Sequence, residues 1–362
     1  MVYRLVLENL KHRPVRTLLS AVAIGVQVTM ILTLVGLSEG LLGDVATRSR
    51  GTGADIMVRP PGSSIIGFSG SNMPQGVVNL VRQQPHVTLA TGSLVQGIGN
   101  FNSIAGIHLN EFNEMSGGFR YLEGGPFTGP NDLIVDDVYA RSVNIHAGDT
   151  IDLGLKFHVS GIVEAGKMSR MFAQIEPLQK KYSQTDKVSI IWVKIDDPAN
   201  TQIVIDELKN ALLDYQVWSV DQYVSLISAN NIPLLRQFTG VVIGLGVVIG
   251  FLVVFLSMYT VVLERTREIG ILKALGASPA YVLGILLRET ILLAVVGSIA
   301  GILMTYGVRS LMHIFAPTFT TVIVHSWWPY ATLIAVVGAL IGALYPGFKA
   351  ARQDAIEALA YD

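Results

Sequence analysis

Long stretches without a charged residue dominate the pattern of apolar and polar positions along this chain. Four segments contain no Asp, Glu, Lys or Arg, and they cover residues 17–38, 237–263, 290–308 and 330–348. Each reaches the roughly 17 to 25 residues that an apolar α-helix needs to cross the hydrocarbon of a bilayer. Four buried helices of a large soluble globule would be the alternative, but soluble cores rarely contain uninterrupted apolar runs of this length. The pattern therefore predicts four transmembrane helices.

The region between the first and second runs has a different pattern, in which short apolar segments alternate with polar turns. The pattern predicts strands at residues 54–60, 88–98, 103–109, 149–153, 157–164 and 188–195, helices at 76–84, 135–143 and 201–215, and a Gly- and Ser-rich loop at 60–76. Helical spacing continues beyond the first run, and residues 221–238 return toward the second, so we expect a helical stalk. The predicted fold class is an α-helical membrane protein with a mixed α+β extracytoplasmic domain inserted between the first and second spans.

Composition and charge agree with this class and set the orientation. Charged residues make up only 15% of the 362 residues, against about 25% in an average soluble domain. Basic residues lie before the first run, within the segment between the second and third runs, and within the C-terminal tail. Between the third and fourth runs the only Lys or Arg residue is Arg309. Because basic flanks are retained on the cytoplasmic side, we predict a multi-pass protein of the plasma (inner) membrane with both termini cytoplasmic.

The predicted layout follows the order of the chain. It consists of a cytoplasmic amphipathic helix at residues 1–16, transmembrane helices at 17–38, 237–263, 290–308 and 330–348, the extracytoplasmic domain and stalk at 39–236, a cytoplasmic coupling segment at 264–289, a short outer loop at 309–329 and a cytoplasmic tail at 349–362. The first run is longer than the apolar region of a secretory signal, and no small-x-small cleavage site follows it, so we expect an uncleaved anchor. The net charge of −1 gives no reason to expect a nucleic-acid partner.

Residue patterns that could carry enzymatic chemistry are weak. GIVEAGKMS at residues 161–169 has the Walker A spacing, but Met168 stands where a Ser or Thr would hold magnesium, and we interpret the segment as a strand-to-loop turn. The seven His form no H-E-x-x-H, Cys is absent, and no G-x-S-x-G occurs, so metal and hydrolase sites are disfavoured. The runs also lack the ionisable groups that ion-coupled carriers use. We predict a non-catalytic membrane subunit with no metal site and no cofactor of its own.

Glycine pairs within the runs are candidates for helix packing. They are Gly240 and Gly244, Gly246 and Gly250, Gly297 and Gly301, and Gly338 and Gly342. Each pair has the G-x-x-x-G spacing that lets membrane helices approach closely. Membrane helices also carry Gly without a packing role, so either interpretation is open for any one pair.

One charged segment, LERTREIGILKALGASPAY at residues 263–281, separates the second and third runs. Ile269, Leu272 and Leu275 share a helical face. Gly276 is typical of a left-handed helix stop, and Ser278 followed by Pro279 is typical of a cap and the first helical residue. The second helix is therefore expected to continue past the membrane, to end near Gly276, and to be followed by a new helix from Pro279. A membrane flank would explain the arginines of this segment but not its two glutamates.

The segment LERTREIGILKALGASPAYVLGILLRETILLAVVGSIAGI resembles the central signature of the MacB-like and FtsX-like ABC transporter permeases, E-R-x-x-E-I-G-I-x-x-A-L-G-A-x. The tail YPGFKAARQDAIEALAYD is similar to the ending of that family, with matches at Pro346, Ala350, Ile356, Glu357, Ala358, Leu359 and Tyr361 and departures at Ala355 and Ala360. The N-terminal LENLKHRPVRTLLSAVAIGV resembles the start of the family. The resemblance thus covers all four predicted spans.

The resemblance implies the permease subunit of an ABC-type exporter (efflux) or extracytoplasmic extraction machine. Such permeases work as a homodimer, or as a pair with a similar permease, and a separate ABC ATPase binds ATP and Mg²⁺. In this family the segment between the second and third spans contacts the ATPase. That implies a coupling role for Glu264, Arg265, Arg267, Glu268, Ile269, Gly270, Lys273, Leu275 and Gly276.

Further expectations follow from the same resemblance. Membrane lipids surround the spans, and a membrane-fusion adaptor is a further partner in part of the family. The FtsX branch implies a different function, a transmembrane signalling scaffold that regulates an extracytoplasmic cell-wall hydrolase. An outer domain of roughly 200 residues, the size of a full domain or more, favours the exporter over the compact regulator.

Overall fold

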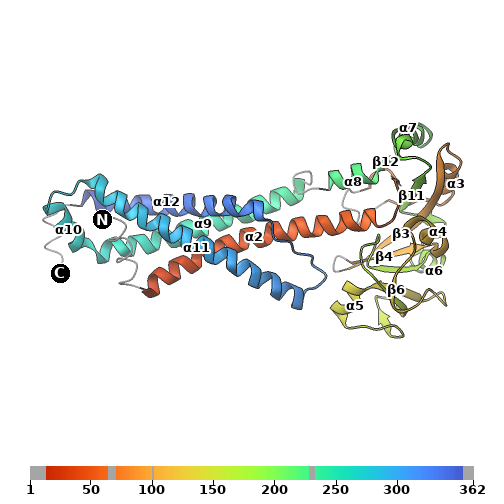
Figure 1. The fold of residues 1–362 in the computed structure, drawn as a ribbon, viewed down its shortest axis with the longest axis horizontal. Coiled ribbons are helices and arrows are strands. Elements are labelled where there is room, and N and C mark those ends of the chain that lie inside the picture. The colour runs from red at the N-terminus through yellow and green to blue at the C-terminus, as the bar shows by residue number, and fades with distance from the viewer. Residues whose placement is uncertain (1–13, 64–70, 100–101, 228–232, 354–362) are drawn as a thin grey trace. The chain divides into compact units, whose positions relative to one another are not determined.

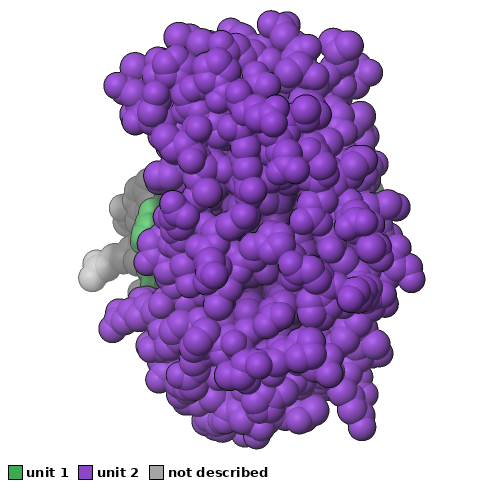
Figure 2. All heavy atoms as spheres, turned by 90° about the vertical axis from the view of Figure 1, so that its right-hand side faces the viewer, with its two compact units in different colours: residues 1–39, 233–314, 321–362 green, residues 40–232, 315–320 purple. Residues whose placement is uncertain are grey.

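The computed structural model describes residues 14–63, 71–99, 102–227 and 233–353. The chain divides into two compact units, which Figure 2 colours separately. The helical unit comprises residues 1–39, 233–314 and 321–362, and the sheet unit comprises residues 40–232 and 315–320. The amphipathic helix predicted before Pro14, residues 64–70 of the predicted loop, residues 228–232 of the returning stalk and residues 354–362 of the tail lie outside the described residues.

Long helices dominate the helical unit (Figure 1). They are α2 (Pro14–Arg50), α9 (Pro233–Glu264), α11 (Pro279–Phe315) and α12 (Trp328–Arg352), and the short elements α10 (Thr266–Ala274) and η2 (His325–Trp327) precede α11 and α12. Among the described residues, four helices are long and apolar enough to cross a membrane, at residues 17–50, 236–264, 279–315 and 325–352. This confirms the four predicted spans.

A row of alanines on α12 contributes to the packing of the helical unit. Ala331, Ala335, Ala339 and Ala343 recur every fourth residue, and each is at most 2% exposed. Residues spaced by four lie above one another on one face of a helix. They share a buried cluster with apolar residues of α2, α9 and α11. Small side chains let helices approach closely, which is the main packing device where lipid removes the hydrophobic driving force between helices.

A ten-stranded sheet is the framework of the sheet unit. Its strands are β1 (Ile56–Arg59), β3 (Val87–Gly99), β4 (Asn102–Ile107), β5 (Tyr121–Gly124), β6 (Asp132–Asp136), β7 (Thr150–Asp152), β8 (Lys156–Val163), β9 (Met171–Gln174), β11 (Ile190–Ile195) and β12 (Gln216–Ser219). Their order is β12-β1-β11-β3-β4-β9-β6-β8-β5, with β7 paired to β8, while β2 (Met73–Pro74) and β10 (Lys187–Val188) pair separately. Strand β3 pairs with β11 through its first half and with β4 through its second half, so it joins the two sides of the sheet.

Short helices between and after these strands complete the sheet unit. They are α3 (Gly76–Arg82), α4 (Leu109–Ser116), α5 (Asp137–Val143), α6 (Ile175–Lys181), α7 (Thr201–Ala211) and α8 (Val220–Leu226), with the 3₁₀ turn η1 (Pro198–Asn200) before α7. The core takes fully buried side chains from several strands, among them Leu94, Ile104 and Leu133. This arrangement confirms the predicted α+β domain between the first and second spans.

One predicted helix begins later than the sequence pattern indicates. The pattern predicts a helix over residues 135–143, but β6 extends to Asp136 and α5 begins at Asp137. Ile134 and Val135 are completely buried in the sheet, and the Asp136 carboxylate accepts a hydrogen bond from the backbone N–H of Tyr139 at 2.7 Å. A carboxylate in this position is a typical helix N-cap. Asp136 therefore ends the strand and starts the helix.

Candidate functional site

The charged segment forms a short helix between two turns. Helix α10 ends at Ala274, and Gly276 has a positive φ of 95°. The backbone N–H of Ala277 donates to the carbonyl of Leu272 at 3.0 Å, which closes the helix end. Helix α11 begins at Pro279, and the Ser278 hydroxyl accepts a hydrogen bond from a backbone N–H in its first turn at 3.2 Å. The predicted stop and restart are confirmed, and both rely on residues suited to them. The second long helix does not continue to Gly276 as predicted, because α9 ends at Glu264 and α10 is a separate helix from Thr266.

Arg265 fixes the start of α10 to α11. Its guanidinium lies 3.5 Å from the Glu289 carboxylate, and the two side chains are only 13% and 5% exposed. A second carboxylate, that of Glu268, lies 4.0 Å from the same guanidinium but is largely exposed. Removing one partner from a buried pair leaves an uncompensated charge, which commonly costs ~3 to 5 kcal/mol. Arg265 is therefore held within the helical unit and is not free to reorient toward another protein.

Lys273 fixes the other end of α10 to α12. Its ammonium donates hydrogen bonds to the backbone carbonyls of Ala351, at 2.9 Å, and Gln353. These carbonyls lie at the C-terminus of α12, where the last turn of a helix leaves carbonyls without an intrahelical partner and where positive charge is favourable. Helix α10 is consequently tied to both neighbouring long helices by its own basic residues.

The nine residues predicted for coupling therefore do not form one surface. Ile269 and Gly270 are buried, and Arg265 and Lys273 are held as described. Exposed are Glu264, Arg267, Glu268, Leu275 and Gly276. Ile271, which is not among the nine, is 46% exposed, and Leu275 is 81% exposed. We call Arg267, Glu268, Ile271 and Leu275 the exposed α10 face; their spacing of three or four residues would have revealed Ile271 as a member.

The predicted glycine pairs differ in their surroundings. A Cβ on Gly297 or Gly301 of α11 would meet the backbone carbonyls of α2 residues at 2.8 and 2.5 Å, and a Cβ on Gly342 would meet the α9 backbone at 2.8 Å. Gly246 and Gly250 of α9 similarly face Met30 and Gln27 of α2. Gly338 has ordinary contact with Val247, whereas Gly240 and Gly244 face no described atom within 4 Å. The Thr29 hydroxyl also donates to the Gly301 carbonyl at 2.9 Å, which joins α2 and α11.

The Walker-like segment of the sheet unit holds its lysine in a structural role. The Lys167 ammonium donates to the carbonyls of Ser116, at 2.6 Å, and Gly118. Both acceptors lie at the end of α4, which Gly117 closes with a left-handed conformation. Burial lowers the pKa of this ammonium. The lysine caps a helix C-terminus, in agreement with the interpretation of this segment as a turn.

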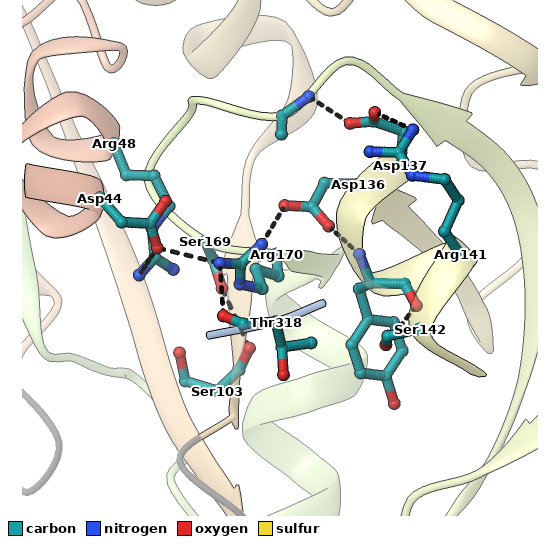
Figure 3. A network of polar contacts seen from close by, with 12 residues as sticks. Asp44, Arg48, Ser103, Asp136, Asp137, Arg141, Ser142, Ser169, Arg170 and Thr318 are labelled. Atoms are coloured by element: carbon teal, nitrogen blue, oxygen red, sulfur yellow. Dashed lines mark hydrogen bonds and ion pairs between the residues drawn. The ribbon is translucent and has the colours of Figure 1, made fainter. Parts of the chain in front are cut away.

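A buried charge cluster in the sheet unit was not foreseen from the sequence. Arg170 lies between the carboxylates of Asp44 and Asp136, and Arg48 pairs with Asp44 (Figure 3). Burial raises the pKa of Asp136 to about 6, although the neighbouring Arg170 guanidinium and the Tyr139 N–H act in the opposite direction. The cluster residues come from three distant parts of the chain, so no local motif could indicate them.

Within the described part of the chain, no group of three or more His, Asp or Glu side chains could hold a metal ion. The buried ion pairs Arg265–Glu289 and Arg170–Asp136 instead hold segments of the chain to one another. The site thus consists of an exposed helix face and of side chains that hold neighbouring segments together.

Two family models match the chain. The model described as MacB-like periplasmic core domain matches residues 17–211, more than half of the chain, and the model described as FtsX-like permease C-terminal matches residues 240–355. The first match includes Asp44, Asp136 and Arg170, and the second includes the charged segment and Thr318. Both describe parts of permeases, in agreement with the predicted non-catalytic chain.

Several curated proteins are similar to this chain. The Macrolide export ATP-binding/permease protein MacB of Mannheimia succiniciproducens is 24% identical over 385 residues, which cover 95% of this chain and 58% of the relative. The Uncharacterized ABC transporter permease MJ1507 of Methanocaldococcus jannaschii is 25% identical over 231 residues, which cover 59% of this chain and 58% of the relative. The ABC transporter permease YtrF of Bacillus subtilis is 28% identical over 171 residues, 43% of this chain and 39% of the relative. This chain thus spans less than two thirds of each of these proteins.

Among solved structures, the periplasmic region of MacB from Actinobacillus actinomycetemcomitans aligns with 49% of this chain and 94% of its own, at 16% identity and a TM-score of 0.38.

Proposed function

Because the chain belongs to the MacB/FtsX-like ABC transporter permeases, we propose that it is the transmembrane subunit of an ABC-type exporter or extracytoplasmic extraction machine. In this proposal a separate ABC ATPase, which binds ATP and Mg²⁺, docks on the exposed α10 face. ATP-driven movement of that partner then passes through the four long helices to the sheet unit. The permease works as a homodimer or as a pair with a similar permease, and both termini lie on the ATPase side of the membrane.

The observation that carries the proposal is the way α10 is held. Arg265 ties its start to α11, and Lys273 ties its end to α12. A helix tied at both ends transmits a push on its outer face to its neighbours instead of bending away. The exposed α10 face mixes Arg267 and Glu268 with the apolar Ile271 and Leu275. A mixed polar and apolar face suits a protein partner, whereas binding to anionic lipid favours uniformly basic residues.

The test exchanges the two charges of this face. The double variant Arg267→Glu/Glu268→Arg keeps the net charge of the chain. Each exchanged charge, however, faces a like charge on a partner that is complementary to the unaltered face. Losing a desolvated charge pair commonly costs ~2 to 5 kcal/mol, so we expect at least roughly 30-fold weaker binding of the cognate ATPase. The measurement is copurification of that ATPase and its dissociation constant for the permease in lipid nanodiscs.

The matched control exchanges another exposed pair, Arg120→Glu/Glu164→Arg, in the sheet unit. These side chains are 76% and 56% exposed and lie 3.2 Å apart, and an exposed pair is worth only ~0 to 1 kcal/mol. We expect this variant to bind the ATPase as the unaltered chain does. Unchanged ATPase binding by the α10 variant would contradict the proposed docking face.

A further inference from the structure

Three segments of the sheet unit meet at one arginine, Arg170, directly before β9. Its guanidinium donates to the Asp44 carboxylate of α2 at 3.0 Å and to the backbone carbonyl of Thr318 at 3.1 Å. The same group pairs with the Asp136 carboxylate, at the end of β6, at 3.4 Å. The Arg170 side chain is only 8% exposed, and Figure 3 places it between Asp44, Asp136 and Thr318.

The end of α2 is held to the same place by further contacts. The Arg48 guanidinium pairs with Asp44 at 2.8 Å. The backbone carbonyl of Arg48 accepts a hydrogen bond from the N–H of Met168 at 2.9 Å. A Cβ on Gly51, just after α2, would collide with the carbonyl of Gly166. The last turn of α2 therefore lies directly against the turn that carries Arg170.

The backbone also connects Arg170 to the sheet on its other side. The N–H of Asp136 donates to the carbonyl of Arg170 at 2.8 Å, and the neighbouring Ser169 hydroxyl donates to the carbonyl of Ser103 in β4 at 3.0 Å. Both the backbone and the side chain at this position are thus fixed to central strands. A displacement of the Arg170 backbone would therefore disturb β4 and β6.

Arginine is chemically suited to such a junction. Its planar guanidinium presents five N–H donors in fixed directions, so it can bind two carboxylates and a carbonyl at once, whereas the ammonium of lysine is a point charge on a flexible stem. Replacing buried ionic groups by apolar ones often leaves stability unchanged, so a buried cluster is poor evidence for stabilisation alone. Its better-attested use is to fix one arrangement of the segments that it joins.

We propose that Arg170 is a positioning residue that makes the end of α2, the sheet and the α11–α12 connection at residues 315–320 move as one body. The chain itself continues from these segments into the long helices α2, α11 and α12. The inference rests on the proposed function, because a rigid junction matters only if those helices move when the ATPase acts. The proposal adds a second segment through which movement reaches the sheet, namely the connection between α11 and α12.

The test measures a distance within the sheet unit by paired spin labels. The chain contains no cysteine, so Lys156→Cys on β8 and Thr320→Cys in the connection label two unique sites. Pulsed electron paramagnetic resonance on the full chain in nanodiscs gives the distance distribution, first alone and then with the ATPase, with and without ATP. We expect one narrow distribution that is the same in all states. In Arg170→Met we expect at least a twofold broader distribution.

Arg141→Met is the matched control, because Arg141 is also a neighbour of the cluster and pairs with Asp137 at 2.7 Å but is 65% exposed. Its distribution is expected to stay narrow. If Arg170→Met fails to fold, Arg170→Lys takes its place, with broadening expected because a lysine cannot reach all three acceptors. An unchanged width in the Arg170 variant, equal broadening in the control, or a distance that shifts with nucleotide in the unaltered chain would overturn the proposal. Failure of the proposed function is read separately, as loss of ATPase binding, and leaves the nucleotide-free comparison intact.

Discussion

Each unit of the molecule contains a buried arginine, and the two are held in different ways. Arg265 pairs with Glu289, only 24 residues further along the chain. Arg170 draws its partners from 34, 126 and 148 residues away. The first arginine closes a local structure of two successive helices. The second joins segments that only the complete tertiary fold brings together.

The surroundings of the two arginines also differ: Arg265 lies beside an exposed helix face, whereas Arg170 is enclosed by other segments. The helix that Arg265 anchors turns another face outward, where Leu275 is 81% exposed. Arg170 lies between α2, central strands and the α11–α12 connection. A local anchor with an exposed face is suited to receive a partner, whereas an enclosed junction can only transmit movement among its own segments. The comparison therefore supports the proposal of docking at one region and of a rigid junction in the other.

The largest expected effect comes from removing the local anchor. Arg265→Met leaves the Glu289 carboxylate buried without its guanidinium, and we expect a loss of ~3 to 5 kcal/mol in the free energy of unfolding. Arg170→Met should cost less, because Asp136 retains the Tyr139 N–H and its raised pKa of about 6 allows it to take up a proton. Chemical unfolding of the purified chains in mild detergent measures both values.

A double variant separates loss of the pair from loss of packing. Arg265→Met/Glu289→Leu removes both charges, and replacement of a buried pair by apolar groups is often close to neutral. We expect it to recover most of the stability that Arg265→Met loses. A double variant as unstable as the single one would mean that the Arg265–Glu289 pair is not what anchors α10.

The next effect distinguishes the two regions by pH. The pKa of Asp136 is raised from 3.8 to about 6 in the folded chain, mainly by burial. In the interval between these values the folded state binds more protons than the unfolded state, so stability falls as the pH rises. The contribution of Asp136 is fully present below about pH 4 and is lost as the pH rises through about 6, a change of up to about 3 kcal/mol.

Asp136→Asn is the variant that tests this dependence. Asparagine can still cap α5 but does not titrate. Unfolding of the sheet unit, followed by the fluorescence of the buried Trp192, is compared at pH 4 and pH 7 in both chains. We expect the pH-dependent difference to shrink by up to about 3 kcal/mol in the variant. The same slope in both chains would show that Asp136 titrates at its ordinary value.

Much of the fold could be predicted because its signals are local. Uninterrupted apolar runs give the four spans, and Gly276 with Pro279 gives the helix end and restart after α10. The helix over residues 135–143 was placed too early because the buried Ile134 and Val135 could serve either element, and only the sheet decides between them. Strand β9 was missed because its four residues form no recognisable period.

The candidate site likewise has features that local sequence signals predict and features that only the tertiary fold decides. The charged segment could be found from its spacing and its resemblance to known permeases, yet the sequence could not separate the exposed Arg267 from the held Arg265. Both are arginines two residues apart, and only the position of Glu289 decides which is buried. The Arg170 cluster gave no signal, because its partners Asp44 and Thr318 become neighbours only through the tertiary fold.

The smallest expected effect concerns the second anchor of α10. Lys273→Met removes the ammonium that donates to the carbonyls of Ala351 and Gln353. These carbonyls lie at a helix end, where they can turn to water, so the loss is about 1 kcal/mol. We expect roughly fivefold faster amide hydrogen exchange in the last turn of α12, with little change in global stability. Lys349→Met is the control, since Lys349 lies in the same last turn but its ammonium contacts the Tyr259 hydroxyl at 3.4 Å rather than the carbonyls of Ala351 and Gln353. If exchange in the last turn is as slow in Lys273→Met as in the control, Lys273 does not hold α10 to α12, and Arg265 alone anchors the docking helix.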